Sequence, residues 1–255
     1  MSERLPLSVA IITYNEEEDL PKTLESVKDI ASEIIIVDSH STDKTREIAK
    51  SFGAKVYEED WKGFGEQKNS AIEKCTQPWI LSLDADEVVS TELKKSIIEA
   101  IKNPKYDCYE VNRKNFYAGK YIEHVWFPEW RVRLFKKGKG KFKGEIHETL
   151  ECKGRKGKLN GVLYHYPYKN LEEHYIKSIK YAKISAEVEF KKGKKFKIHQ
   201  LLLNPSWAFF KMYILKKGFL DGIRGFSIAK SYSYAKFLKY LFLWELEEKN
   251  KNAKS

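Results

Sequence analysis

The chain has 255 residues, of which 42% are hydrophobic, so it is long enough to bury a core and its composition excludes wholesale disorder. The net charge of +11 is uneven, because residues 1–103 carry 13 Lys and Arg against 21 Asp and Glu, whereas residues 104–255 carry 34 against 15. A half this basic predicts a polyanionic partner, which could be nucleic acid, anionic lipid or a phosphorylated glycan; a solvated lysine-rich surface is the alternative.

Strands and helices alternate along the first hundred residues. Apolar, β-branched runs predict strands at residues 7–12, 34–37, 55–57 and 79–83. Helical spacing, capping residues and a terminal Gly or Pro predict helices at residues 20–27, 41–52, 65–74 and 91–103, the last capped by Thr91. Alternation with such short loops indicates a parallel sheet that helices cover on both faces.

The pattern changes after residue 107. Strands with one wet face are predicted at residues 109–113, 131–135 and 162–165, with a Gly/Lys-rich hairpin or mobile loop at 136–144 and turns at 153–161. From about Tyr168 the sequence predicts amphipathic helices at residues 171–190, 207–217 and 226–244. We therefore expect an α/β domain over residues 1–168 and a basic, aromatic helical extension over residues 169–255.

The three cysteines, Cys75, Cys108 and Cys152, are widely spaced and include no CxxC pair. This spacing disfavours a zinc site and a disulfide framework, so we expect three separate thiols in a reducing compartment.

Acidic residues follow two of the predicted buried strands. Asp38 ends the second strand, and Asp84-Ala85-Asp86-Glu87 closes the fourth. Gathering carboxylates in one place costs free energy unless a cation or a sugar hydroxyl binds to them. Ligands of open parallel sheets lie at the carboxyl ends of the strands, where Thr13 to Glu16 also fall. The sequence predicts one ligand site there.

The two aspartates around Ala85 suit a divalent cation. On an extended strand, Asp84 and Asp86 would face the same side, and oxygen ligands favour Mg²⁺ or Mn²⁺ bound partly through a substrate diphosphate. A solvated turn or a helix-capping acid is the alternative. Asn15, Glu16 and Asp38 could likewise bind a nucleobase or ribose, or simply cap helices. Neither GxGxxG nor P-loop spacing occurs, and no HExxH is present.

Three motifs resemble glycosyltransferase family 2: Ile11–Glu16, Ile36–Asp43 and Leu83–Glu87, in that order and at the strand ends. The resemblance implies a GT-A fold, with a mostly parallel nucleotide-binding sheet in residues 1–110 and an acceptor-side half in residues 111–168. It further implies inverting, metal-dependent transfer from a nucleotide-diphosphate sugar, most often a UDP-sugar. Where the commoner pattern has Asp-Gly-Ser, this chain has Asp38-Ser39-His40.

Within that family the chain resembles the lipopolysaccharide core glucosyltransferase-like branch. The resemblance rests on three segments: Trp130–Phe135, Gly144–Glu148 and Lys217–Gly222. It implies a membrane-borne glycolipid acceptor such as lipopolysaccharide core, and polyprenyl phosphate is the alternative acceptor.

The resemblance also implies roles for individual residues. Asp38 would bind the nucleobase, Asp84 would contact ribose or the donor sugar, and Asp86 would hold the metal. Lys68, in the stretch Gln67-Lys68-Asn69, could meet the diphosphate. Arg131 and Arg133 share a strand face and could grip phosphate or merely solvate an edge. The expected nucleotide-sugar site comprises Thr13, Tyr14, Asn15, Glu16, Asp38, Lys68, Asp84, Ala85, Arg131 and Arg133.

An acceptor hydroxyl must lose its proton as it attacks, so a carboxylate or histidine is needed within hydrogen-bond reach. We favour Glu148 as this base, with Glu145 and Glu129 as alternatives; an ordinary exposed acid is the other interpretation of Glu148. His147 is a candidate to orient the acid, ligate the metal or contact the diphosphate.

The aromatic, lysine-rich C-terminal segments resemble helices that lie at a membrane interface, and lysines favour anionic lipid. A helical subdomain core or a homodimer seam is the alternative. No run of about 18 consecutive apolar residues and no signal-peptide core occurs. We expect a cytoplasmic protein, peripheral on the inner face of the cytoplasmic membrane. The rival class, a nucleic-acid-binding protein, is disfavoured because the carboxylate sites would repel phosphate.

Overall fold

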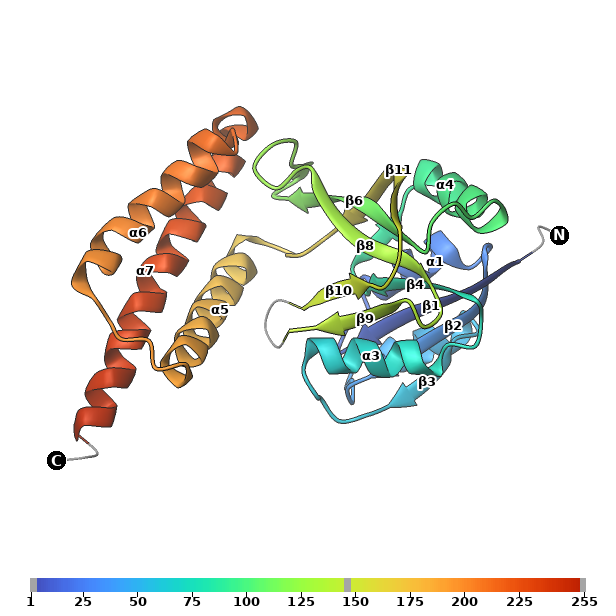
Figure 1. Ribbon diagram of the computed structural model, residues 1–255, viewed down its shortest axis with the longest axis horizontal. Coiled ribbons are helices and arrows are strands. Elements are labelled where there is room, and N and C mark those ends of the chain that lie inside the picture. The colour runs from blue at the N-terminus through green and yellow to red at the C-terminus, as the bar shows by residue number, and fades with distance from the viewer. Residues whose placement is uncertain (1–3, 145–147, 253–255) are drawn as a thin grey trace. The chain divides into compact units, whose positions relative to one another are not determined.

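The computed structural model describes residues 4–144 and 148–252 (Figure 1). It divides into two units, of which the first contains the chain up to Lys114 together with Glu129–His165. The second contains Asn115–Pro128 and the chain from Tyr166 onward. Residues 115–128, which we assign from sequence to the first domain, thus pack with the C-terminal helices.

A parallel sheet forms the centre of the first unit. Its strands run in the order β3-β2-β1-β4, with bounds Lys55–Glu58, Ala31–Asp38, Leu5–Thr13 and Trp79–Asp84. All four were predicted from their apolar runs. Alternate residues of β1 enter opposite cores, so that Val9 packs in one cluster and Ala10 in the other. The sheet is therefore covered on both faces, as its apolar strands require.

Four helices flank these strands: α1 Leu20–Val27, α2 Thr45–Ser51, α3 Phe64–Lys74 and α4 Thr91–Lys102. The helix α1 buries Leu20, Leu24 and Val27 against the sheet, as the spacing predicts. The predicted cap of α4 was wrong by one residue, because Ser90 Oγ accepts the Leu93 amide and Thr91 is already helical.

Antiparallel strands extend the sheet beyond β4 in the order β8-β6-β11-β5. Their bounds are Glu129–Lys136, Cys108–Tyr117, Lys156–His165 and Glu87–Val89. The strand β11 begins inside the stretch that we predicted as turns. The three-residue β5, which follows the acidic motif directly and pairs with β11, was not predicted.

The Gly/Lys-rich segment folds as a hairpin of β9 Gly140–Lys143 and β10 Thr149–Cys152. Phe142 and Leu150 bury this hairpin in the same core as Cys108 of β6. This packing joins Cys108 to Cys152 in a disulfide with a Cα–Cα distance of 6.3 Å. The expectation of three separate thiols was wrong, because a pair 44 positions apart carries no spacing signal and only tertiary packing brings it together. Cys75 is a buried free thiol.

Helices make up most of the second unit, with bounds α5 Leu171–Lys191, α6 Ile198–Phe210 and α7 Gly222–Asn252. A π-helical turn η1 (Lys211–Leu215) and a 3-10 turn η2 (Gly218–Asp221) connect α6 to α7, and the short strand β7 (Lys120–Tyr121) pairs with the end of β6. The helix α7 packs against both α5 and α6 (Figure 1). Within the described residues, no helix is long and apolar enough to cross a bilayer.

Candidate active site

The carboxyl ends of three parallel strands meet at one edge of the sheet. Thr13 of β1 lies beside Asp38 of β2, and Ile12 lies beside Asp84 of β4. The acids that close the second and fourth predicted strands therefore lie at a common edge, as the sequence predicts. This edge is where open α/β sheets bind ligands.

Asp38 is fully buried and organises the loop after β2. Its carboxylate accepts hydrogen bonds from Thr13 Oγ1 at 2.7 Å, from the Ser41 amide at 2.8 Å and from Ser41 Oγ at 2.6 Å. Arg46 Nε lies 3.9 Å from the same carboxylate. His40 adopts a left-handed backbone conformation, with φ of 60°, where the loop turns. The Asp38 carboxylate therefore fixes the conformation of the loop after β2.

The turn after β1 is joined to that loop. Asn15, with φ of 56°, accepts the Thr42 amide on Oδ1 at 2.8 Å and donates its own amide to Ser41 Oγ at 2.9 Å. The Glu16 amide donates to Thr45 Oγ1 at 2.7 Å. Tyr14 remains exposed beside them. Thr13, Tyr14, Asn15 and Glu16 therefore lie at the sheet edge predicted for the nucleotide.

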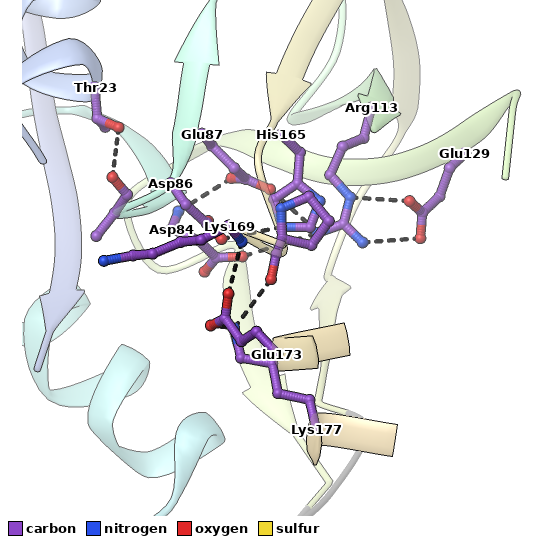
Figure 2. A network of polar contacts seen from close by, with 12 residues as sticks. Thr23, Asp84, Asp86, Glu87, Arg113, Glu129, His165, Lys169, Glu173 and Lys177 are labelled. Atoms are coloured by element: carbon purple, nitrogen blue, oxygen red, sulfur yellow. Dashed lines mark hydrogen bonds and ion pairs between the residues drawn. The ribbon is translucent and has the colours of Figure 1, made fainter. Parts of the chain in front are cut away.

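The acidic motif after β4 forms a tight turn instead of a continued strand. Strand β4 ends at Asp84, whose amide donates to Glu87 Oε2 at 3.0 Å, and the Ala85 carbonyl accepts Thr23 Oγ1 of α1 at 2.6 Å (Figure 2). The expectation that Asp84 and Asp86 face the same side of an extended strand was wrong, because Asp86 lies in the turn. The two carboxylates contact different partners.

Asp84 is held by cations on both oxygens. Lys68 Nζ lies 2.6 Å from Oδ1, and Arg133 Nη2 donates to Oδ2 at 2.7 Å. Burial alone would raise the pKa of Asp84, but Arg133, Lys68 and Arg113 together hold it well below its ordinary value. Asp84 is therefore an ionised acceptor over the whole physiological pH range.

A second layer of ion pairs supports that contact. The fully buried Glu87 accepts Arg133 Nη2 at 2.5 Å and Arg113 Nη1 at 3.3 Å. Arg113 also donates two hydrogen bonds of 2.9 Å to Glu129 (Figure 2). Burial would raise the pKa of Glu129, but its bonds to Arg113 and Arg131 lower that pKa to about 2. Arg133 is thus fixed inside the protein, whereas Arg131 is half exposed.

Lys68 connects the sheet edge to the β9–β10 hairpin. Its ammonium, 6% exposed, donates to Glu148 Oε1 at 2.8 Å as well as contacting Asp84. Burial would lower the pKa of Lys68, but the two carboxylates raise it above its ordinary value. Its neighbours Gln67 and Asn69 bond to Ser39 Oγ and to the Phe142 backbone. Three consecutive residues of α3 therefore join three parts of the site.

Asp86 pairs with a histidine that we did not predict. His165 Nε2, at the end of β11, lies 3.4 Å from Asp86 Oδ2 (Figure 2). Within residues 4–144 and 148–252, no group of three or more His, Cys, Asp or Glu side chains is arranged to hold a metal. Glu145 and His147, a candidate base and a candidate metal ligand, lie outside the described residues.

Three residues of the site escaped the sequence argument: Glu87, Arg113 and His165. Glu87 stands within the acidic motif itself, and this position was the one available signal for it. Arg113 and His165 end up at the site because β6 and β11 lie beyond β8 in the same sheet, an order that the sequence pattern does not reveal.

Comparison with known proteins identifies the chain by family. The model of glycosyl transferase family 2 matches residues 8–159. A lipopolysaccharide core biosynthesis glycosyltransferase, LpsC of Rhizobium meliloti, is 31% identical over 93% of this chain and 92% of its own length. An uncharacterized glycosyltransferase of Rickettsia typhi is 34% identical over 96% of this chain and 89% of its own length.

Solved structures agree on the fold. A crystal structure of S. aureus TarS in complex with UDP-GlcNAc superposes with a TM-score of 0.52 and 16% identity, over 91% of this chain and 90% of that one. The fold is of the GT-A type, as the motifs at the strand ends imply. By its family match and its relatives, the chain belongs to glycosyltransferase family 2.

Proposed function

We propose that this enzyme is an inverting glycosyltransferase that moves a sugar from a UDP-sugar to a membrane-borne glycolipid such as lipopolysaccharide core. One contact carries the proposal: Lys68 bridges Asp84, on the donor edge of the sheet, and Glu148, on the hairpin where we expect the acceptor. The similarity to LpsC supports the acceptor class, and the family supports the donor class.

The donor would lie along the sheet edge. The loops that Asn15 and Asp38 hold would receive the nucleotide, and Asp84 would accept a hydroxyl of ribose or of the donor sugar. Because Lys68 and Arg133 keep Asp84 ionised, this acceptor would not change its charge between substrates and products. The exposed Arg131 is the guanidinium better placed to reach phosphate, since Arg133 is enclosed by Asp84 and Glu87.

In the reaction, the acceptor oxygen forms a bond to the anomeric carbon while the bond from that carbon to the diphosphate oxygen breaks on the opposite face. The acceptor proton passes to the Glu148 carboxylate, and the electron pair of the broken bond stays on the nucleoside diphosphate. Through its contact with Asp84, Lys68 would stay beside Glu148 and the leaving diphosphate. Its positive charge would favour the negative charge that develops on the diphosphate.

A divalent cation at this site would be bound partly through the substrate. Asp86 and His165 would hold it, and diphosphate oxygens and water would complete its shell, as Mg²⁺ and Mn²⁺ sites commonly do. When bound, the ion would neutralise charge on the leaving diphosphate. His147 remains a candidate further ligand.

The proposed location is cytoplasmic and peripheral on the inner face of the membrane, where a lipid-linked acceptor would be met. Polyprenyl phosphate remains the alternative acceptor, and an assay that offers both lipids will separate them. Membership of the transferase family argues against nucleic acid as the partner.

A thermal-shift screen of UDP-sugars with and without Mn²⁺ tests the donor and the metal, since a ligand of the native state raises its apparent stability. We expect a UDP-sugar to stabilise the protein more with Mn²⁺ than without it, and Asp86→Asn and His165→Ala to remove the Mn²⁺ increment. Asp29→Asn, which changes an acid paired with Lys94 at the surface, is the matched control. No shift with any nucleotide sugar would refute the proposal.

A further inference from the structure

The turn that joins α6 to α7 exposes several large apolar side chains. Within residues 215–223, which we call the α6–α7 tip, four large apolar residues are exposed: Leu215, Phe219, Leu220 and Ile223. Ile223 is 74% exposed and Leu220 is 54% exposed. Exposed large apolar side chains gathered within nine residues indicate an interaction site more often than an ordinary water-facing surface.

Contacts within the second unit hold the backbone of the tip in place. Gly225 of α7 lies so close to Gly218 that an added Cβ would come within 1.8 Å of the Gly218 carbonyl oxygen. The Asp221 carboxylate, 6% exposed, accepts the backbone amides of Glu123, His124 and Val125 at 2.8 to 3.2 Å. These contacts fix η2 against its own unit and leave Phe219 and Leu220 pointing outward.

Charge on the tip indicates what covers it. Lys216 and Lys217 lie among the apolar residues, are exposed, and form no ion pair within the described part of the chain. Apolar side chains that enter a bilayer beside lysines at the headgroup level are the pattern of an interfacial membrane anchor. Protein interfaces are instead depleted of lysine, and a symmetric contact with a second copy would bring these lysines together.

We propose that the α6–α7 tip inserts its apolar side chains into an anionic lipid bilayer, with Lys216 and Lys217 on the lipid headgroups. In Figure 1 the tip is the turn at which the orange and red helices α6 and α7 meet. This inference deepens the proposed function, because it names the surface by which the transferase would reach a lipid-borne acceptor. The biological role of membrane binding rests on the proposed function, but the binding itself can be tested without measuring sugar transfer.

The test is flotation of the full chain with vesicles of phosphatidylcholine alone or with phosphatidylglycerol as about a third of the lipid. We expect binding to the anionic vesicles that weakens at high salt. The double variant Leu220→Ser/Ile223→Ser should bind those vesicles about tenfold or more weakly, because it removes the apolar surface that would enter the lipid. Lys216→Gln/Lys217→Asn should lose the preference for anionic lipid; Asn suits the left-handed φ of 55° at position 217.

Ile176→Ser is the matched control, since Ile176 is a 57% exposed apolar residue of α5 and not part of the tip, and it should bind as the unchanged protein does. UDP-induced thermal stabilisation in each variant reports an intact fold and an intact donor site, independently of lipid. Equal vesicle binding by the unchanged protein and the Leu220/Ile223 variant would overturn the inference. If the unchanged protein did not bind vesicles but formed a dimer, and Leu220→Ser/Ile223→Ser dissociated that dimer, the tip would be assigned to contact with a second copy of the chain instead.

Discussion

Lys68 Nζ lies 2.8 Å from Glu148 Oε1 although the two residues are 80 positions apart in the chain. The same ammonium lies 2.6 Å from Asp84, so one buried cation joins a helix, a strand end and a hairpin. The close approach of α3 to the hairpin depends on Gly65, whose added Cβ would lie 3.0 Å from the Gly144 carbonyl oxygen. Two carboxylates that would otherwise repel each other are thereby held on either side of one ammonium.

Replacing Lys68 by Met should therefore impair both the fold and the reaction. Removing one partner of a buried ion pair typically costs about 3–5 kcal/mol, and the lower end applies here because Asp84 and Glu148 keep some access to water. We expect a lower urea midpoint and a fall in kcat of about a hundredfold, since a preorganised charge beside the reacting groups is lost.

The matched control for Lys68→Met is Lys94→Met, which removes a lysine paired with the exposed Asp29. That variant should change stability by less than about 1 kcal/mol. Unchanged transfer by Lys68→Met in the folded state would show that the bridge has no part in the reaction.

Glu148→Gln keeps the shape of the side chain and removes its ability to take a proton. If Glu148 is the base, kcat should fall by about 10²–10⁴-fold while the thermal shift with UDP-sugar is kept. The neighbouring Glu151→Gln, on β10 and paired with Lys143 at the surface, should transfer at the normal rate. Normal transfer by Glu148→Gln would direct attention to Glu145, because Glu129 is already committed to Arg113 and Arg131.

The sequence predicted the parallel half of the sheet well because its signals are local. Buried strands such as Ile34–Val37 are apolar throughout, and the acids that end them lie at the sheet edge for purely topological reasons. The contacts of Lys68, by contrast, were not predictable, since an ordinary helix lysine has the same sequence pattern.

Apart from the cap of α4, which was misplaced by one residue, the wrong expectations depend on contacts that the pattern of a single segment does not reveal. Asp86 leaves the strand because Asp84 bonds to Glu87 three residues on, and β5 exists only because β11 pairs with it. Cys108 and Cys152 meet only because the hairpin folds onto the core beside β6. No periodicity within a single segment reports such partners.

Reduction of the Cys108–Cys152 disulfide should destabilise the protein. The bond closes a loop of 44 residues, for which the chain-entropy model gives about 3–4 kcal/mol. We expect dithiothreitol to lower the urea midpoint of the unchanged protein, and Cys152→Ser to lower it equally without reductant. Dithiothreitol should leave Cys152→Ser unaffected, because Cys75 is a buried free thiol; a further effect there would contradict the assignment of the bond.

The stability of the protein should also fall between pH 6.5 and pH 4 because of one buried histidine. His174 is 2% exposed, its Nδ1 lies 2.7 Å from the Tyr117 hydroxyl, and burial lowers its pKa to about 4. The unfolded chain therefore binds one more proton than the folded chain in this range, so folding weakens as the pH falls. At pH 5 the expected loss from His174 is about 2 kcal/mol relative to pH 7.

Urea unfolding of the unchanged protein and of His174→Gln at pH 7 and pH 5 measures this loss. The variant keeps a side-chain acceptor for Tyr117 but cannot gain a proton, so its unfolding free energy should change about 2 kcal/mol less between the two pH values. Glu33 and Glu129, whose pKa values are both lowered to about 2, begin to lose their stabilising effect only below about pH 4.5. These two glutamates therefore contribute little to the change in unfolding free energy between pH 7 and pH 5. If that change were equal in the unchanged protein and in His174→Gln, His174 would be excluded as its source.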